Sequence, residues 1–215
     1  RIILPLYSTI PEELRKTMTF VCSVTVPVAW RRQYCGVFEA HLDGVIYYFI
    51  DNQYYFKRDG LYGYYDDAER FTFFSRAVLE VLPHIDFTPD IIHCNDWQTA
   101  LIPVYLDAFY KQNAFYKDIK TVFTIHNIEY QGKFGYDVLG DVFGIDSCHI
   151  PLLEWGGCMN LMKGAIASAD LVTTVSQRYA EEICSSEHAH GLDRILRTCT
   201  DKLSGILNGI DYTYY

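Results

Sequence analysis

The amino-acid sequence predicts an α/β fold, a Rossmann-like parallel sheet flanked by helices with a β-hairpin insertion. Two observations predict it. From residue 90 onward, short apolar runs of β type alternate with segments of helical periodicity, which is typical of a parallel sheet covered by helices. Before that, Asp43-Gly44 stands between two runs rich in Val, Phe, Tyr and Ile, and this arrangement indicates a hairpin.

The N-terminal part of the chain is expected to be mainly β structure. Residues 2–6 have the composition of a buried strand, and residues 19–50 that of antiparallel strands. A loop is expected over residues 51–67. Apolar residues then recur at helical spacing from Phe71 onward, so a helix is expected that ends near Pro83.

Strands and helices alternate along the rest of the chain. The expected strands cover residues 90–94, 120–125, 170–175 and 204–207, and the expected helices cover about 97–112, 158–168, 176–185 and 191–199. Ser176 directly follows a strand, and its hydroxyl makes it a suitable N-cap for the next helix. Since no linker or internal repeat divides the chain, residues 1–215 are expected to form one domain.

Length, composition and charge exclude several classes of protein. The chain has 215 residues, of which 50% are hydrophobic, so a core of its own is feasible. The formal net charge is −9 and no basic patch occurs, so nucleic acid is not an expected partner. No apolar run approaches the roughly 20 residues of a membrane helix, so a membrane is not an expected partner either.

Cysteine usage and missing motifs narrow the choice further. The seven cysteines are odd in number, form no CxxC pair and follow no signal peptide, which is typical of free thiols in a reducing cytosol. A cytoplasmic location is therefore expected. No GxGxxG, Walker, GxSxG or HExxH motif is present, which argues against a dehydrogenase, a P-loop enzyme, an α/β hydrolase and a zinc protease.

Polar side chains follow two of the expected parallel strands. Asp96 comes just after the strand at 90–94, and His126 and Asn127 come just after the strand at 120–125. Ligands of an open parallel sheet bind outside the carboxyl ends of its strands, so a site for a hydroxyl-rich ligand is expected there. Two simpler interpretations remain open. Asp96 could cap the following helix, and His126 could satisfy backbone groups of its own loop.

A metal site is not expected at these strand ends. His93 and His126 lack the paired His or Cys spacing of zinc sites, and no cofactor is expected from any other motif. Two further positions are candidates for ligand binding. Tyr62 lies between Gly60 and Gly63 in an aromatic-rich loop, where its ring could stack on a sugar. Asn208 follows the last expected strand, where Asn-Gly is either a turn or a loop at the same sheet edge.

Six strings, taken together and in this order, resemble the bacterial glycogen synthase and plant starch synthase family. They are WRRQYCGVFE (30–39), YFIDN (48–52), HCNDWQT (93–99), TIHNIEYQG (124–132), ADLVTTVS (169–176) and GILNGID (205–211). The resemblance implies a GT-B fold of two Rossmann-like domains. It also implies a retaining glucosyltransferase that moves glucose from ADP-glucose to the non-reducing end of an α-1,4-glucan. Residues 1–215 would be the N-terminal, acceptor-side domain.

The resemblance also implies roles for single residues. His126 would lie at the transferred glucose and Asp96 would bind the sugar or the acceptor, so both are candidate catalytic residues. Candidate substrate-binding residues are Asn127 and Tyr130 in the same wall, Tyr62, Asn208 at the donor cleft, and Gly191 and Leu192 of a Gly-Leu-Asp stretch beside the active site.

Two departures from the family pattern limit what is expected of the chain alone. The Lys-x-Gly-Gly loop that cradles the donor phosphates in the family is absent, and so is the C-terminal nucleotide-binding domain. The chain therefore resembles a fragment truncated at both ends, which is expected to be inactive by itself. Its partners, ADP-glucose and an α-1,4-glucan, are expected for the full-length enzyme. Two alternatives stay open: a non-catalytic glucan-binding module, and a GT-B transferase that uses another sugar nucleotide.

Overall fold

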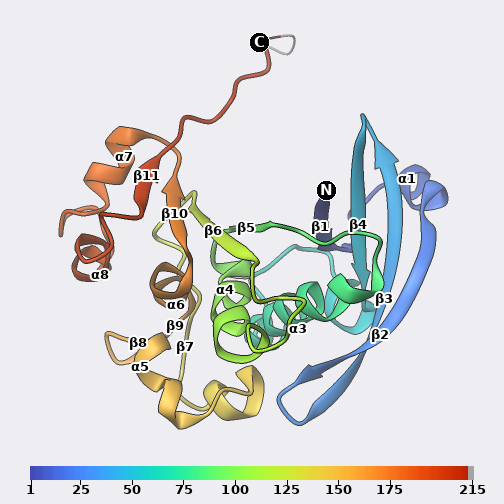
Figure 1. Cartoon of the computed structure of the whole chain (residues 1–215), viewed down its shortest axis with the longest axis horizontal. Coiled ribbons are helices and arrows are strands. Elements are labelled where there is room, and N and C mark those ends of the chain that lie inside the picture. Colours follow the sequence, from blue (N-terminus) through green and yellow to red (C-terminus); the bar gives the residue numbers. More distant parts are fainter. Residues whose placement is uncertain (213–215) are drawn as a thin grey trace. The chain divides into compact units, whose positions relative to one another are not determined.

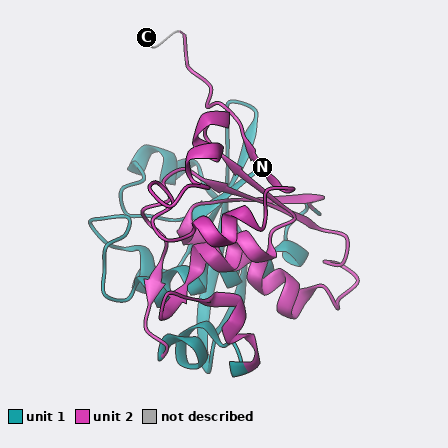
Figure 2. Cartoon of the chain, turned by 90° about the vertical axis from the view of Figure 1, so that its left-hand side faces the viewer, with its two compact units in different colours: residues 1–88, 137–147 teal, residues 89–136, 148–215 magenta. Residues whose placement is uncertain are grey.

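The computed structural model describes residues 1–212, and its contacts divide the chain into two compact units. Unit 1 holds residues 1–88 and 137–147. Unit 2 holds residues 89–136 and the chain from residue 148 onward (Figure 2). The assignment of residues 1–215 to one glycosyltransferase domain stays a prediction. The two units are therefore described separately.

Unit 1 is built on a four-stranded sheet in the order β1-β4-β3-β2 (Figure 1). Its strands are β1 (Ile2–Pro5), β2 (Thr19–Val28), β3 (Arg31–Leu42) and β4 (Val45–Asp51). The hairpin predicted at Asp43-Gly44 is confirmed. Both residues have positive φ, 49° and 76°, which suits the right-handed twist of the paired strands β3 and β4. β1 pairs with β4 in parallel.

The helices of unit 1 are α1 (Glu12–Thr17), α2 (Gln53–Phe56), α3 (Asp67–Val81), the 3-10 turn η1 (Leu82–His84) and the π-helical turn η4 (Leu139–Phe143). The predicted helix that ends near Pro83 is confirmed as α3, whose aromatic and aliphatic side chains are buried against β2, β3 and β4. The loop predicted over residues 51–67 contains α2. Asn52 accepts a hydrogen bond from the backbone of Tyr55, and this cap outweighs the loop-like composition.

Unit 2 carries the parallel sheet that the sequence predicts (Figure 1). The strands are β5 (Ile91–Asn95), β6 (Lys120–Ile125), β10 (Leu171–Thr174) and β11 (Leu203–Gly205), in the order β11-β10-β6-β5. Every neighbouring pair is parallel. A second, antiparallel sheet joins β7 (Lys133–Phe134), β9 (Cys158–Asn160) and β8 (Glu154–Trp155).

The helices that accompany these strands are mostly shorter than predicted. They are η2 (Trp97–Thr99), α4 (Leu101–Tyr105), η3 (Leu106–Tyr110), η5 (Ser147–His149), α5 (Ile150–Leu153), α6 (Leu161–Ser168), α7 (Gln177–Glu182) and α8 (Asp193–Arg197). The helix expected at 97–112 is a succession of 3-10, α and π turns. The N-cap predicted at Ser176 is confirmed, since its hydroxyl accepts from the Tyr179 N–H at 3.0 Å.

One glycine fixes how closely β11 approaches α7. A Cβ atom added to Gly205 would lie 2.1 Å from the Ser176 carbonyl oxygen and 2.2 Å from the Gln177 nitrogen. Only a residue without a side chain fits this contact, which holds the carboxyl end of β11 against the first turn of α7. Within residues 1–212, no helix is long and apolar enough to cross a membrane.

Candidate functional site

The carboxyl ends of β5 and β6 bring Asp96 and His126 together. The two strands are parallel neighbours with Asn95 opposite Thr124, so the residues that follow them emerge at the same edge. The backbone N–H of His126 donates to Asp96 Oδ1 at 2.9 Å. The His126 ring nitrogen Nε2 lies 3.0 Å from Asn95 Oδ1. His126 is exposed and Asp96 is half-buried, and Asp96 Oδ2 makes no hydrogen bond within residues 1–212, so the ring and this oxygen are available to a ligand.

Asp96 has an unusual backbone conformation, with φ 56° and ψ −178°. This region is populated almost only by glycine and costs another residue about 1–3 kcal/mol. The Asp96 N–H donates to the Thr124 carbonyl at 3.0 Å, which helps to hold the conformation. Asp96 stands at the N-cap position of η2, but its side chain makes no capping bond to that turn. Its carboxylate instead accepts a hydrogen bond from the His126 backbone N–H.

A row of polar side chains crosses β5, β6 and β10 beneath this edge. His93 Nε2 lies 2.6 Å from Thr124 Oγ1, and Thr124 Oγ1 lies 2.6 Å from Thr173 Oγ1. His93 is exposed at the side of β5, yet partial desolvation lowers its pKa, and the nearby His126 ring lowers it further. The neutral form of His93 is therefore favoured, and its Nε2 either accepts a hydrogen bond from the Thr124 hydroxyl or donates one to it, depending on the tautomer.

Asn127 and Tyr130 lie on the loop that follows His126. Asn127 Oδ1 accepts from the Glu129 N–H at 2.9 Å, an Asx turn that shapes the loop. Ile128 is buried, and its N–H lies 3.3 Å from the Tyr179 hydroxyl of α7. Tyr130 is 53% exposed. Burial of Ile128 and its contact with Tyr179 thus anchor the loop, while Asn127 and Tyr130 remain accessible.

Two buried amides join this loop to the segment that carries Gly191. Gln131 Nε2 donates to the carbonyls of Ile128, at 3.0 Å, and of His190, at 3.1 Å. Asn160 Nδ2 donates to Gln131 Oε1 at 2.7 Å and so holds the amide in place. Neither Gln131 nor Asn160 is predicted from the sequence as a site residue. Gln131 stands inside the string TIHNIEYQG, but nothing local shows that its side chain points inward.

Because His190 is bonded to Gln131, Gly191 lies next to the loop that follows His126. Its φ of 89° requires glycine, and its carbonyl accepts from the Trp155 indole at 2.7 Å. Leu192 is fully buried next to it and leads into α8. Its N–H donates to the Ala189 carbonyl and its carbonyl accepts from the Leu196 N–H, so no part of Leu192 is accessible to a ligand in this structure.

Asn208 follows β11 in the exposed segment 206–212. β pairing continues one residue past β11, because the Ile206 N–H donates to the Thr174 carbonyl at 2.7 Å. Beyond that residue every described side chain is exposed, and the side chain of Asn208 makes no hydrogen bond within residues 1–212. The structure thus does not bond Asn208 to the residues around His126.

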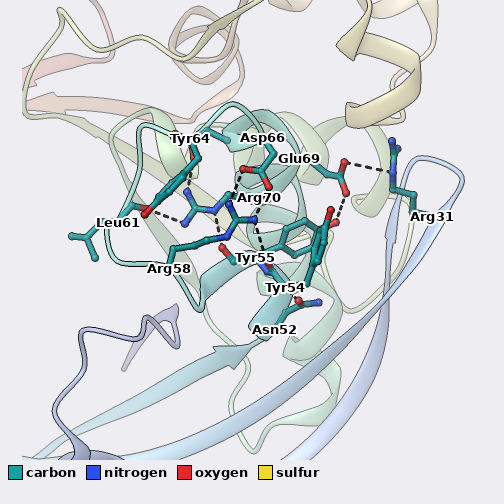
Figure 3. A network of polar contacts seen from close by, with 11 residues as sticks. Arg31, Asn52, Tyr54, Tyr55, Arg58, Leu61, Tyr64, Asp66, Glu69 and Arg70 are labelled. Atoms are coloured by element: carbon teal, nitrogen blue, oxygen red, sulfur yellow. Dashed lines mark hydrogen bonds and ion pairs between the residues drawn. The ribbon is translucent and has the colours of Figure 1, made fainter.

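Tyr62 belongs to unit 1. The loop on either side of it, at Leu61 and Tyr64, is held by Arg58 and Arg70 (Figure 3). Arg58 pairs with Asp66 at 2.7 Å, and the Gly60 N–H donates to the Tyr64 hydroxyl at 2.7 Å. Tyr62 itself is 51% exposed. The loop is therefore ordered by its own contacts while it presents the Tyr62 ring.

Arg70 of α3 is the centre of that network (Figure 3). It is fully buried and paired with Asp67, and it donates to the carbonyls of Tyr55, at 2.8 Å, and Leu61, at 3.1 Å. Asp67 in turn accepts from the Gly63 N–H at 2.6 Å. A buried ion pair with all of these hydrogen bonds fixes the backbone on both sides of Tyr62.

The chemistry of the two strand ends in unit 2 suits hydroxyl groups. The Asp96 carboxylate can accept hydrogen bonds, and the His126 imidazole and the Asn127 carboxamide can both donate and accept them. No group of three or more His, Cys, Asp or Glu side chains in the described part of the chain is placed to hold a metal ion. The polar side chains at this edge can hold a polar ligand by hydrogen bonds.

Comparison with known proteins identifies the family. A family model described as the starch synthase catalytic domain matches residues 1–198. The chain belongs to this family. The resemblance inferred from the six strings is thereby confirmed.

Curated relatives extend the match over the whole chain. Proteins named glycogen synthase from Geobacillus thermodenitrificans and Geobacillus stearothermophilus are each 54% identical over 217 residues, and the one from Desulforamulus reducens is 52% identical. Each alignment covers 100% of this chain and 45% of the relative. The chain thus spans somewhat less than half the length of these starch synthase family members.

A solved structure supports the fold. The catalytic domain of starch synthase IV from Arabidopsis thaliana, bound to ADP and acarbose, superposes with a TM-score of 0.90 at 34% identity. The match covers 99% of this chain and 45% of that chain. The predicted α/β fold of the starch synthase family is confirmed by this agreement.

Proposed function

We propose that the chain is the acceptor-side part of a glycogen synthase. The full enzyme transfers glucose from ADP-glucose to the non-reducing end of an α-1,4-glucan and retains the anomeric configuration. One observation carries the proposal: in a member of the starch synthase family, the Asp96 carboxylate fixes the exposed His126 at the carboxyl edge of a parallel sheet. The names of the relatives support it, as does the Arabidopsis structure bound to ADP and acarbose.

His126 and Asp96 have separate tasks in this proposal. The His126 ring binds a hydroxyl of the transferred glucose, and its backbone lies near the anomeric centre, where positive charge develops as the bond to phosphate breaks. Asp96 uses Oδ1 to hold the His126 N–H, so Oδ2 is left to accept from a sugar hydroxyl. Asn127, Tyr130 and the Gly191 backbone form the adjoining wall, and Tyr62 and Asn208 bind further parts of the substrates.

The leaving diphosphate needs positive charge that this edge does not supply. No Lys or Arg occurs in residues 90–99 or 124–131, the two strand ends that carry Asp96 and His126. Stabilisation of a diphosphate leaving group requires cations or backbone amides aimed at its oxygens. We therefore propose that residues outside this chain bind the diphosphate and that the 215 residues alone are inactive. From the bacterial relatives named glycogen synthase, we also propose that the enzyme acts in the cytoplasm.

The test is a glucosyl-transfer assay. Residues 1–215 are joined to the remaining segments of the Geobacillus stearothermophilus glycogen synthase, and ADP-glucose and glycogen are supplied. We expect transfer, and we expect His126→Ala to reduce kcat/KM at least about a hundredfold, or ~2.7 kcal/mol of transition-state stabilisation. His188→Ala, an exposed histidine of unit 2, is the matched control and should retain activity.

Two outcomes would favour the alternatives. A folded chimera that binds maltooligosaccharides but transfers glucose from no nucleotide donor would favour a non-catalytic glucan-binding module. Transfer from UDP-glucose in preference to ADP-glucose, with the chain in its own full-length protein, would favour a GT-B transferase for another donor. Cooperative thermal unfolding of the chimera is checked first, so that loss of activity is not loss of the fold.

A further inference from the structure

Unit 1 has a pocket of about 450 Å³ at the carboxyl ends of its two parallel strands. Leu6 and Ser8 follow β1 and line one side, and Asp51 is the last residue of β4. Gln53 and Lys57, which follow β4, line the same edge. The volume is within the range of small-molecule sites, roughly 300–1,000 Å³. The carboxyl edge of a parallel pair is also where such sites form in α/β proteins.

Four of the polar side chains around this pocket are free to bind a ligand. Within residues 1–212, the side chains of Glu12, Asp51, Gln53 and Lys57 make no hydrogen bond and no ion pair. Asp51 is half-buried, and burial raises its pKa while Arg15 opposes the rise. The Asp51 carboxylate accepts no hydrogen bond within residues 1–212, so a ligand hydroxyl can donate to it.

Arg15 has a different task, because it holds the wall of the pocket. Its guanidinium donates to the carbonyl of Ile10, at 3.1 Å, and to the carbonyl of Tyr7. These bonds tie α1 to the segment that follows β1. The wall is therefore set before a ligand arrives, and less conformational entropy is lost on binding.

Charge and shape together define the ligand. Two carboxylates, Glu12 and Asp51, balance two cations, Arg15 and Lys57, so the pocket has no net charge to attract an ion. Carboxylates accept from hydroxyl groups, and an ammonium and an amide donate to them. Met18 and Phe38 supply an apolar wall. This combination suits a ring with hydroxyl groups at its rim and an apolar face.

We propose that this pocket binds a neutral oligosaccharide through one to three pyranose rings, with Asp51 as the main acceptor and Lys57 and Gln53 as donors. All of the lining residues belong to unit 1, and none of them has a role in the glucosyl transfer proposed above. The proposal does not depend on that reaction. It adds a carbohydrate-binding site whose occupancy is measurable without turnover.

The test is titration of the ¹⁵N-labelled 215-residue chain with maltotriose, followed by NMR. We expect shifts at the amides of Ser8, Asp51 and Gln53, and a Kd at least tenfold weaker for Asp51→Asn. Lys57→Met is a second variant at an exposed position, where folding is not at risk, and we expect weaker binding from it too. Asp43→Asn, at the tip of the β3–β4 hairpin, is the matched control and should bind as the wild type does.

Three other outcomes would count against the proposed pocket site. No shifts at these amides with maltotriose or cellotriose up to tens of millimolar would overturn the proposal, and so would equal affinity of the wild type and Asp51→Asn. Binding of ADP at the same amides would contradict the neutral ligand. His126→Ala should leave maltotriose binding at these amides unchanged. If the transfer assay fails while this binding persists, only the proposed transfer reaction is lost.

Discussion

The backbone N–H of His126 donates to Asp96 Oδ1 at 2.9 Å, so a strained residue at the end of β5 holds the first residue after β6. The contact spans 30 positions of the sequence. Since His126 is exposed and has its ring bonded to Asn95, its position depends on these two neighbours. A change at Asp96 is therefore expected to act on stability through the backbone and on activity through His126.

Two substitutions at Asp96 separate backbone strain from the hydrogen bond. Asp96→Ala loses the acceptor and keeps the strain, whereas Asp96→Gly loses the acceptor and relieves the strain. After the entropy cost of glycine, we expect the Gly variant to be about 1 kcal/mol more stable than the Ala variant. For a chain of this size that is roughly 2–4 °C in Tm, measurable by circular dichroism of the 215-residue chain.

The matched pair is Asp201→Ala and Asp201→Gly, at an exposed position outside the positive-φ residues. There the Ala variant should be at least as stable as the Gly variant. If the Ala variant at Asp96 is likewise at least as stable as the Gly variant, backbone strain at Asp96 does not lower stability. In the glucosyl-transfer assay both Asp96 variants are expected to be impaired, because neither holds the His126 N–H.

His93 is expected to make stability depend on pH. Its pKa is lowered in the fold by partial desolvation and by His126, so the unfolded chain binds the proton more tightly. The stabilisation is thus complete above the unfolded pKa of about 6.5 and declines as pH falls toward the folded value. We expect the drop in Tm between pH 7.5 and pH 5.5 to be smaller in His93→Gln than in the wild type.

Carboxylates titrate in the same range, so only the difference between variants is informative. His84→Gln, at an exposed histidine at the end of η1, is the control and should show the pH dependence of the wild type. Identical pH dependence of His93→Gln and the wild type would show that the Thr124 contact is equally favourable for the charged ring.

Removal of the Gln131 amide is expected to loosen the His126 loop. Gln131→Ala leaves Asn160 Nδ2 and the carbonyl of His190 without their buried contacts. A buried polar group left unsatisfied costs about 1–3 kcal/mol. We expect a loss of stability in that range, measured by urea unfolding, and faster hydrogen exchange at Ile128. Gln112→Ala, at an exposed glutamine, should change neither. Unchanged exchange in Gln131→Ala would show that the loop does not depend on this amide.

Gly205→Ala is expected to be strongly destabilising. The added methyl group would overlap the Ser176 carbonyl, so β11 or α7 has to shift. Overpacking of this kind costs about 1–3 kcal/mol, and more where backbone is displaced. Gly209→Ala is the matched control, because a Cβ there meets nothing within 4 Å. Thermal unfolding of both variants is the measurement, and equal Tm values would show that β11 does not lie against α7 as described.

Much of the fold could be predicted because its signals are local. The turn at Asp43-Gly44, the cap at Ser176 and the apolar runs of the parallel strands each depend on a few adjacent residues. The bounds of the helices were harder to predict from the sequence. The segment at 97–112 has helical periodicity throughout, yet its first turn is 3-10 and its last is π, because packing within unit 2 decides the local pitch.

The sequence by itself determined the order of the strands along the chain, the parallel arrangement in unit 2 and the polar residues at two strand ends. Only the tertiary structure decided that the Asp96 side chain bonds to His126 and makes no capping bond to η2, that Leu192 is buried, and that Gln131 joins its loop to His190 across 59 positions. The reason is physical. Periodicity and capping are set by neighbours in sequence, whereas a hydrogen-bond partner far along the chain is chosen by the packing that brings it near.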